Sequence, residues 1–213
     1  MMLKKIIVGS LQANCYVVYN PTTLDAFIID PGSDYKKINR FIKDNELNIK
    51  AILLTHGHYD HIGATNSFLV NFPNLPIYIH EDDALFLSNP SMNLSNNFSN
   101  EKCIIKPNNL HTFKDEEKLN IAGFTIDCRH YPGHTPGSCM YFIESLNVIF
   151  SGDVLFSKSI GRFDLPYGNR MDMIETLRKI KQITHNYDIY PGHDQKTPMF
   201  EELNENPYWL SIN

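Results

Sequence analysis

The stretch His56-Gly57-His58-Tyr59-Asp60-His61 places three imidazoles and a carboxylate within six positions. It directly follows the apolar run Ala51-Ile52-Leu53-Leu54, which is too short for a helix and predicts a buried strand. With this composition, the pattern H-x-H-x-D-H arises by chance about once in a thousand sequences of this length. Imidazole and carboxylate groups are ligands that divalent ions such as zinc accept. The stretch therefore predicts a metal site at the carboxyl end of a strand.

An apolar run followed by glycine and one ligand-type residue occurs at three further places in the chain. These places are Gly133-His134, Gly152-Asp153 and Gly192-His193. Glycine lets a backbone approach a site closely, and loops beyond strand ends are where a rigid scaffold gathers ligands. We therefore expect one metal centre built from five histidines and two aspartates: His56, His58, Asp60, His61, His134, Asp153 and His193.

These ligands are more than one ion uses, so the sequence predicts two divalent metal ions that share a carboxylate. The ligand atoms are all nitrogen and oxygen, which favours Zn²⁺ and also permits iron or manganese. The remaining histidines follow no pattern, and we expect ordinary core or surface roles for His80, His111, His130 and His185. The cysteines form no C-x-x-C pair, so we expect free thiols at Cys15, Cys103, Cys128 and Cys139.

The composition is that of a soluble globular protein. The chain has 213 residues, 42% apolar and 20% charged, and we expect residues 1–213 to form a single domain. The formal net charge of −5 argues against a nucleic-acid partner. No run reaches the ~18 apolar residues of a membrane span, and the apolar segment after Lys4 and Lys5 is too short for a signal peptide. We expect a cytoplasmic monomer or homodimer that acts on a small molecule, with no membrane or nucleic-acid partner.

Short β-branched and aromatic runs alternate with helical patterns along the chain. Strands are expected at residues 6–8, 15–19, 26–29, 51–54, 77–79, 124–127, 139–143, 148–150 and 188–190. Helices are expected after Ser33 or Asp34, at 61–71, after Asn169 and at 201–210. The Ser- and Asn-rich segment 88–100 is expected to be a surface loop. Two β-rich halves with helices predict an α+β fold in which two sheets pack face to face with helices outside.

The pattern H-x-H-x-D-H, followed by a single His, Asp and His, resembles the metallo-beta-lactamase superfamily. The resemblance spans nearly the whole chain, from Asn14-Cys15-Tyr16 to Gly192-His193-Asp194. It implies a four-layer αββα sandwich of two mixed sheets, with the metal centre at one edge between them. It also implies a first ion held by His56, His58 and His134, a second held by Asp60, His61 and His193, and a bridging carboxylate from Asp153. Asp30 resembles a carboxylate that supports these ligands, although Asp30-Pro31-Gly32 also has the composition of a plain turn.

Within the superfamily, the chain is most similar to glyoxalase II, the hydroxyacylglutathione hydrolases, and its short relatives. The similarity is carried by residues 11–16 and 152–156 and by Gly161-Arg162-Phe163. It implies that Arg162 binds the substrate by holding the carboxylate of glutathione. Two features differ from glyoxalase II: the chain ends where that enzyme adds a helical domain, and no aromatic residue follows closely behind His193.

The resemblance implies a metal-dependent hydrolase, and the expected substrate is a thioester such as S-D-lactoylglutathione or a related acyl-thiol. A hydroxide bridging the two ions would attack the carbonyl carbon, and Asp60 would act as the catalytic residue that orients it. A thiolate leaving group has a conjugate-acid pKa of ~8.5 and needs little proton assistance. The alternatives within the superfamily are a persulfide dioxygenase with a single iron ion, a lactonase and a nuclease.

Overall fold

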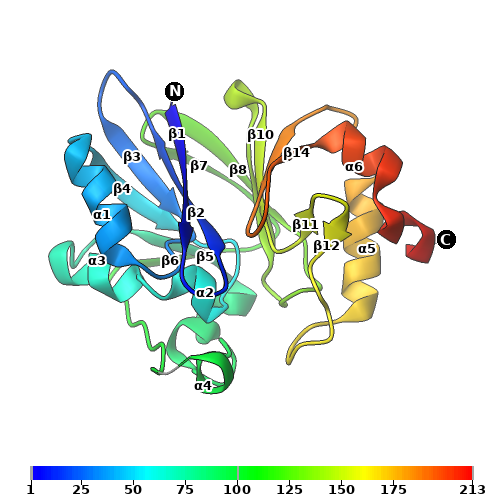
Figure 1. Ribbon diagram of the computed structural model, residues 1–213, viewed down its shortest axis with the longest axis horizontal. Coiled ribbons are helices and arrows are strands. Elements are labelled where there is room, and N and C mark those ends of the chain that lie inside the picture. Colours follow the sequence, from blue (N-terminus) through cyan, green and yellow to red (C-terminus); the bar gives the residue numbers. More distant parts are fainter. Residues whose placement is uncertain (1, 100, 213) are drawn as a thin grey trace.

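Two six-stranded sheets lie face to face in the computed structural model, which describes residues 2–99 and 101–212 (Figure 1). Helices cover the outer face of each sheet, so the layers run helix, sheet, sheet, helix. Both sheets contain parallel and antiparallel pairs. The predicted α+β fold, a four-layer αββα sandwich of two mixed sheets, is confirmed.

The first sheet is formed by the amino-terminal half of the chain. Its strands lie side by side in sequence order: β1 (Met2–Val8), β2 (Ala13–Tyr19), β3 (Asp25–Ile29), β4 (Asn48–Leu53), β5 (Ile77–His80) and β6 (Leu110–Phe113). The first three strands are antiparallel, and β3 to β6 are parallel. Every residue of β2 is buried, which is typical of a strand covered on both faces.

The second sheet is formed by the carboxyl-terminal half. Its order is β14 (Thr197–Pro198), β13 (Asp188–Pro191), β10 (Val148–Gly152), β9 (Cys139–Ile143), β8 (Phe124–His130) and β7 (Glu116–Ile121). Only the β10–β13 pair is parallel among the described strands of this sheet. A small separate hairpin, β11 (Leu155–Phe156) and β12 (Ser159–Ile160), follows β10.

Helices and short 3₁₀ turns connect and cover the strands. The α-helices are α1 (Tyr35–Asp44), α2 (Tyr59–Ile62), α3 (Thr65–Asn71), α4 (Ser95–Phe98), α5 (Arg170–Ile180) and α6 (Met199–Glu205). The 3₁₀ segments are η1 (Glu81–Ser88), η2 (Glu144–Leu146) and η3 (Pro207–Ile212). No helix in the described ranges is long and apolar enough to cross a membrane.

Alternate residues of each strand enter different cores, because successive side chains of a strand point to opposite faces. Val17 packs in the core shared with α1 and α3, whereas Val18 packs between the two sheets. In the second sheet, Tyr141 lies between the sheets and Phe142 packs in the core shared with α5. Three apolar layers therefore hold the sandwich together and fix the two sheets that carry the ligand loops.

Two predicted helices are each divided into two elements. The helix predicted at 61–71 is α2 followed by α3, and the break lies at Gly63-Ala64, where the Ala64 amide donates to the carbonyl of Gly32. The helix predicted at 201–210 begins earlier, as α6, and gives way to η3 at Pro207. Proline lacks an amide hydrogen and clashes with the preceding turn, so it ends a helix.

The segment 88–100 is less of a free loop than its composition predicts. It contains α4, and Asn93, Leu94 and Ser95 within it are buried; residue 100 lies outside the described residues. Strands β6 and β7 were not predicted, because most of their side chains are exposed and form no apolar run. The predicted free state of the cysteines is confirmed at all four positions.

Candidate metal centre

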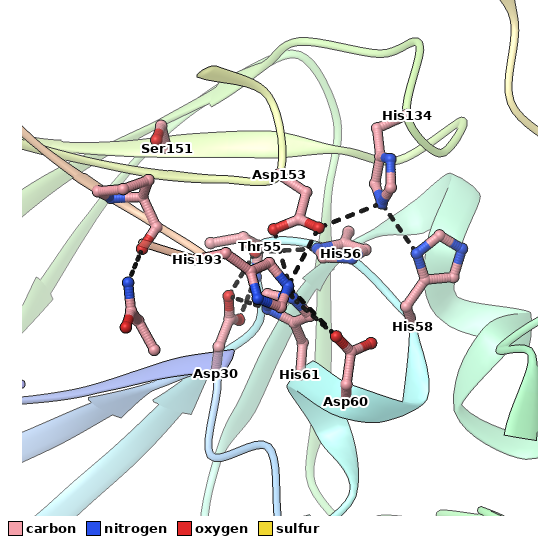
Figure 2. Close-up of polar contacts among 12 residues, drawn as sticks. Asp30, Thr55, His56, His58, Asp60, His61, His134, Ser151, Asp153 and His193 are labelled. Carbon is pink, nitrogen blue, oxygen red and sulfur yellow. Dashed lines mark hydrogen bonds and ion pairs between the residues drawn. The ribbon is translucent and has the colours of Figure 1, made fainter. Parts of the chain in front are cut away.

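The ends of strands from both sheets meet at one edge of the sandwich. In the first sheet, β4 ends at Leu53, just before the turn that carries His56 and His58 and the short helix α2. In the second sheet, ligand-type residues follow the ends of β8, β10 and β13. Figure 2 shows the side chains from the two sheets pointing toward one another. The structure thus brings together all the ligand candidates that the sequence places on separate loops: His56, His58, Asp60, His61, His134, Asp153 and His193.

Three buried histidines form one half of the site. One ligand nitrogen from each of His56, His58 and His134 lies within 4.8 Å of the others. Nδ1 of His58 is 2.9 Å from Nε2 of His134. Nε2 of His56 is buried and has no hydrogen-bond partner in the described part of the chain. Because buried polar nitrogens are normally satisfied, an orphaned nitrogen within a cluster of three imidazoles is typical of a metal site.

A carboxylate and two histidines form the other half. One ligand atom from each of Asp60, His61 and His193 lies within 4.8 Å of the others. Nε2 of His193 is 3.4 Å from Nε2 of His61 and 3.3 Å from Oδ2 of Asp60. The mixed nitrogen and oxygen set suits the same divalent ions as the three-histidine half.

Asp153 lies between the two halves. Its Oδ2 is 3.6 Å from Nε2 of His134 in one half and 3.5 Å from Nε2 of His193 in the other. Its Oδ1 is 3.4 Å from Nε2 of His61 and is buried without a hydrogen-bond partner in the described ranges. A carboxylate that faces both groups is in the position of the bridging ligand that the resemblance implies.

The three-histidine half is held in the form that binds metals. Burial, together with the neighbouring imidazoles, keeps the pKa of His56 well below its usual value. Burial and the imidazole of His134 do the same to the pKa of His58. Both rings are therefore neutral at pH 7, which is the state in which imidazole offers a lone pair.

The other half concentrates negative charge. Although burial favours the neutral acid, the imidazoles of His61 and His193 hold the pKa of Asp60 well below its usual range. Burial also opposes a charge on His61, yet Asp153 and Asp60 raise the pKa of its ring to about 10. A divalent cation would neutralise the same negative field. The orphaned atoms, the neutral imidazoles and this field together show that the residues fit divalent metal ions.

Asp30 fixes the orientation of two of the histidines. Its Oδ2 lies 2.9 Å from Nδ1 of His61 and accepts from the hydroxyl of Thr55 at 2.5 Å, while its Oδ1 accepts from the Thr55 amide at 2.8 Å. The single hydroxyl hydrogen of Thr55 is used by Asp30, so its oxygen accepts from Nδ1 of His56, 3.2 Å away. Both histidines thereby present Nε2 to the site.

A second buried carboxylate, Asp83, joins the ligand loops of the two sheets. It accepts from the Gly57 amide of the first loop, and from the Gly137 amide and the Thr135 hydroxyl of the other, each at 2.7 Å. No sequence pattern singles out Asp83. Asp83 belongs to the acidic run Glu81-Asp82-Asp83, and nothing in that run marks which carboxylate turns inward.

Two histidines without a sequence pattern also meet. The rings of His80 and His130 stack with centroids 3.9 Å apart and planes at 13°. Nε2 of His130 donates to the carbonyl of Pro136 at 2.7 Å. Burial, together with His130, lowers the pKa of His80 to about 4, so the stacked pair carries no charge repulsion at pH 7. The pair supports the loop behind His134 and lies outside the ligand set.

Glycine is required where the strand ends approach the carboxylate ligand. Gly152 has φ +49°, which is a left-handed conformation that favours glycine. A Cβ at Gly192 would lie 2.1 Å from Oδ1 of Asp153 and 2.7 Å from the ring of His61. The Gly-ligand pairs that the sequence repeats are therefore steric requirements of the site.

Arg162 lies beside the candidate metal centre, but its side chain is paired with Asp164. Its guanidinium forms two hydrogen bonds with Asp164, Nε to Oδ1 at 2.8 Å and Nη2 to Oδ2 at 3.0 Å, and both side chains are exposed. Its backbone carbonyl accepts from Nδ1 of His134 at 2.7 Å, which leaves Nε2 of His134 for a ligand. The substrate-binding role of Arg162 stays a prediction, and Asp164 competes with a substrate for its guanidinium.

Five of the seven ligand candidates line a cavity of about 480 Å³: His58, Asp60, His134, Asp153 and His193. The cavity has the size of a small-molecule site. Its other described lining side chains are apolar except for Tyr59 and Arg162. A substrate in this cavity would therefore contact both the ligand residues and apolar side chains.

The comparisons with known proteins agree with this geometry. The sequence profile of the metallo-beta-lactamase superfamily matches residues 8–193. The probable metallo-hydrolase YqgX of Bacillus subtilis is 34% identical over 209 residues, which cover 98% of this chain and 97% of YqgX. The hydroxyacylglutathione hydrolase GloC of Haemophilus influenzae is 33% identical over 212 residues, which cover 98% of each chain.

Solved structures give the same result. The BLEG-1 B3 metallo-beta-lactamase is 36% identical and superposes with a TM-score of 0.91, covering 97% of this chain and 99% of that one. TTHA1623, solved in a di-iron-bound form, is 29% identical with a TM-score of 0.83, covering 96% of this chain and 99% of that one. Since the profile spans most of the chain and the relatives align along nearly their whole length, this chain belongs to the metallo-beta-lactamase superfamily and is a metallo-hydrolase of that fold.

Proposed function

We propose that this metallo-hydrolase hydrolyses thioesters at a centre of two divalent ions. The observation that carries the proposal is the full set of seven ligand-type side chains, five of which line a cavity large enough for an acyl substrate. His56, His58 and His134 would hold one ion, Asp60, His61 and His193 the other, and Asp153 would contact both. The set suits Zn²⁺, and the di-iron form of TTHA1623 supports iron as the second choice.

Divalent ions held there would lower the pKa of water toward ~7 and polarise a substrate carbonyl. The side chains of the protein orient the reaction. Asp60 is ionised at neutral pH, because the neighbouring imidazoles outweigh the effect of burial on its pKa. Its carboxylate can accept a hydrogen bond from the attacking water and hold the water's lone pair toward the carbonyl carbon. This is the catalytic role that we assign to Asp60.

The chemistry of the leaving group distinguishes two possible substrate classes, thioesters and amides. Apart from the ligand residues, Tyr59 and Arg162 are the described lining side chains with a hydrogen to donate. The Tyr59 hydroxyl donates to the carbonyl of Phe98, and the Arg162 guanidinium donates to Asp164. An amide nitrogen needs a proton in order to leave, whereas a thiolate leaves with little assistance. The Tyr59 hydrogen is used by Phe98, and the guanidinium, whose pKa Asp164 raises further, holds its protons too tightly to act as a general acid. The absence of a proton donor among these described lining side chains therefore favours a thioester.

The relatives support the same substrate class. GloC of Haemophilus influenzae carries the name hydroxyacylglutathione hydrolase, which denotes the hydrolysis of a glutathione thioester. The test is a panel consisting of S-D-lactoylglutathione, an uncharged thioester, a lactone and a persulfide, assayed with the metal-loaded protein and again after chelation. We expect metal-dependent release of thiol from a thioester. Oxygen consumption with the persulfide and no thiol release from any thioester would instead identify a dioxygenase.

A second candidate, hydrolysis of β-lactams, is favoured by one observation. The BLEG-1 B3 metallo-beta-lactamase is 36% identical to this chain and superposes with a TM-score of 0.91. Ring strain makes a β-lactam amide easier to open than an ordinary amide. A chromogenic cephalosporin belongs in the same panel, and a kcat/KM above that for every thioester would make the β-lactam the preferred substrate.

A further inference from the structure

We infer that the cavity selects substrates by an uncharged, apolar acyl group and not by the charges of glutathione. This inference rests on the proposed thioester hydrolysis and narrows it to one substrate class. It is carried by two features of the cavity: the nature of its walls and the pairing of its cation.

The walls are formed by three separate segments that each present apolar side chains. Leu11 comes from the turn between β1 and β2, the α4 segment supplies a second wall, and the β11–β12 hairpin with the loop after it supplies a third. The apolar lining residues are Leu11, Leu94, Phe98, Phe156, Ile160 and Leu165. Leu94 and Ile160 are buried, whereas Leu11 is 50% and Phe98 61% exposed, so the wall extends from the floor to the rim.

The α4 wall is fastened to the metal centre. Tyr59, which stands between His58 and Asp60 in the sequence, donates from its backbone amide to the carbonyl of Asn93 at 2.9 Å. Its hydroxyl donates to the carbonyl of Phe98 at 3.1 Å. Asn93 in turn donates to the carbonyls of Phe86 and Cys103. The wall is therefore already positioned before a substrate binds, which lowers the entropic cost of binding.

The cation of the cavity is already paired with a carboxylate along one edge. Arg162 is the one described Lys or Arg side chain among the lining residues, and its guanidinium makes a bidentate pair with Asp164. A carboxylate of glutathione would have to bind beside Asp164, whose negative charge repels it, or displace Asp164 from the Nε–Nη2 edge. An apolar acyl group gains by leaving water and needs no such exchange. The contacts available in this cavity therefore favour apolar over charged substrates.

The test compares two series of thioesters that differ only in the thiol. Acetyl, butyryl and hexanoyl thioesters of N-acetylcysteamine, which is uncharged, are assayed beside the same acyl thioesters of glutathione. Burial of each added methylene is expected to raise kcat/KM roughly threefold, so the butyryl thioester should exceed the acetyl one by about tenfold. The glutathione members should be no better than their uncharged counterparts. A flat profile, or a tenfold preference for the glutathione series, would overturn the inference.

Three variants locate the effect. Phe98→Ser and Leu11→Ser remove exposed wall side chains and should weaken the dependence on acyl length. Val70→Ser is the matched control, because Val70 is 80% exposed on α3 and outside the cavity, and it should keep the wild-type profile. A length dependence that survives the loss of both wall residues would place the acyl group elsewhere and contradict the inference.

A fourth variant tests the paired cation. Asp164→Asn removes the competing carboxylate, so Arg162 becomes available to an anionic thiol. The KM for the glutathione thioesters should fall severalfold, and the KM for the N-acetylcysteamine thioesters should not change. If Arg162→Ala in an otherwise wild-type chain raises the KM for glutathione thioesters tenfold, Asp164 does not neutralise this cation and the inference fails.

Binding of thioethers separates this inference from the proposed function, because thioethers bind without reacting. Calorimetry should show S-hexyl-N-acetylcysteamine binding at least tenfold more tightly than the S-ethyl compound, with Phe98→Ser reducing the difference. If that result appears while no thioester is hydrolysed, the proposed function fails and the apolar site stands. If thioesters are hydrolysed but both thioethers bind equally, the proposed function stands and the apolar selectivity is wrong.

Discussion

Nδ1 of His61 lies 2.9 Å from Oδ2 of Asp30, and both side chains are buried. The contact leaves Nε2 of His61 directed at Asp153 and His193, where the second ion is proposed to bind. Asp30 also accepts from Thr55, whose hydroxyl oxygen accepts from His56. One carboxylate therefore sets the ligand nitrogen of a histidine in each half of the site.

Asp30→Asn is expected to weaken metal binding without removing a ligand. The amide cannot accept from Thr55 and from His61 as the carboxylate does, so the orientation of both rings is loosened. Loss of such a supporting partner typically costs 10–100-fold in metal affinity. A Zn²⁺ titration of the apo-protein measures the effect. Asp44→Asn, at an exposed carboxylate of α1, is the control and should bind as the wild type does. If Asp30→Asn binds Zn²⁺ as tightly as Asp44→Asn does, Asp30 does not orient the ligands and serves only the turn.

Asp153→Ala should reduce both metal content and activity. Its carboxylate faces His134 in one half of the site and His193 in the other. If Asp153 bridges two ions as proposed, its removal takes one ligand from each and leaves their separation unfixed. We expect fewer than two ions per chain by elemental analysis and a heavy loss of kcat. Two tightly bound ions in this variant would show that Asp153 does not bridge.

Asp60→Asn tests the catalytic role of Asp60. The change keeps the shape of the side chain but removes the charge that lies 3.3 Å from Nε2 of His193. Because the interaction with the attacking water acts mainly in the transition state, kcat should fall strongly while circular dichroism shows an intact fold. A change confined to KM would mean that Asp60 contributes to substrate binding and not to orientation.

Asp83→Asn should destabilise the junction between the two ligand loops. Asp83 accepts from Gly57, Thr135 and Gly137, and an amide group would turn a donor toward at least one of these donors. Leaving a buried donor unsatisfied costs about 1–3 kcal/mol, which chemical denaturation can measure. Asp82→Asn is the matched control, since Asp82 is the adjacent residue and its side chain is 51% exposed.

The pH dependence of stability gives an independent test of Asp83. Burial raises the pKa of Asp83 to about 6, although its three hydrogen bonds act in the opposite direction. When a carboxyl group binds its proton more tightly in the folded chain than in the unfolded one, the free energy of unfolding falls as the pH rises from the unfolded pKa, ~3.9, to the folded pKa. Between pH 4 and 6, the wild type should therefore lose stability relative to Asp83→Asn. A relative gain over that range would show that the hydrogen bonds outweigh burial.

The fold was predictable where burial leaves a signature in the sequence. Strands β2 and β9 and the last three residues of β4 are buried on both faces, which gives them largely apolar sequences. The exposed strands β6 and β7 have no such run, and only their hydrogen bonds to β5 and β8 reveal them. The division of the helix at 61–71 depends on a contact with Gly32, which is distant in the sequence.

The site residues, like the strands, were predictable only where a local sequence pattern marks them. The ligand candidates can be recognised in the sequence because histidine and aspartate are rare at such spacing and because they follow predicted strand ends. Asp83 and the His80–His130 stack could not be found in this way, because each depends on two segments meeting in space. Likewise, the motif around Arg162 indicates a cation near the site, but only the structure shows that Asp164 already holds it.

The number of metal ions bound by the active protein decides whether the seven ligand candidates form a catalytic metal centre. Apo-protein prepared by chelation is titrated with Zn²⁺, and bound metal and thioester hydrolysis are followed in the same samples. We expect binding to end at close to two ions per chain, and activity, absent from the apo-protein, to rise with binding. Full hydrolysis by metal-free protein, or no retained metal at any Zn²⁺ concentration, would contradict a metal-dependent hydrolase built on these seven residues.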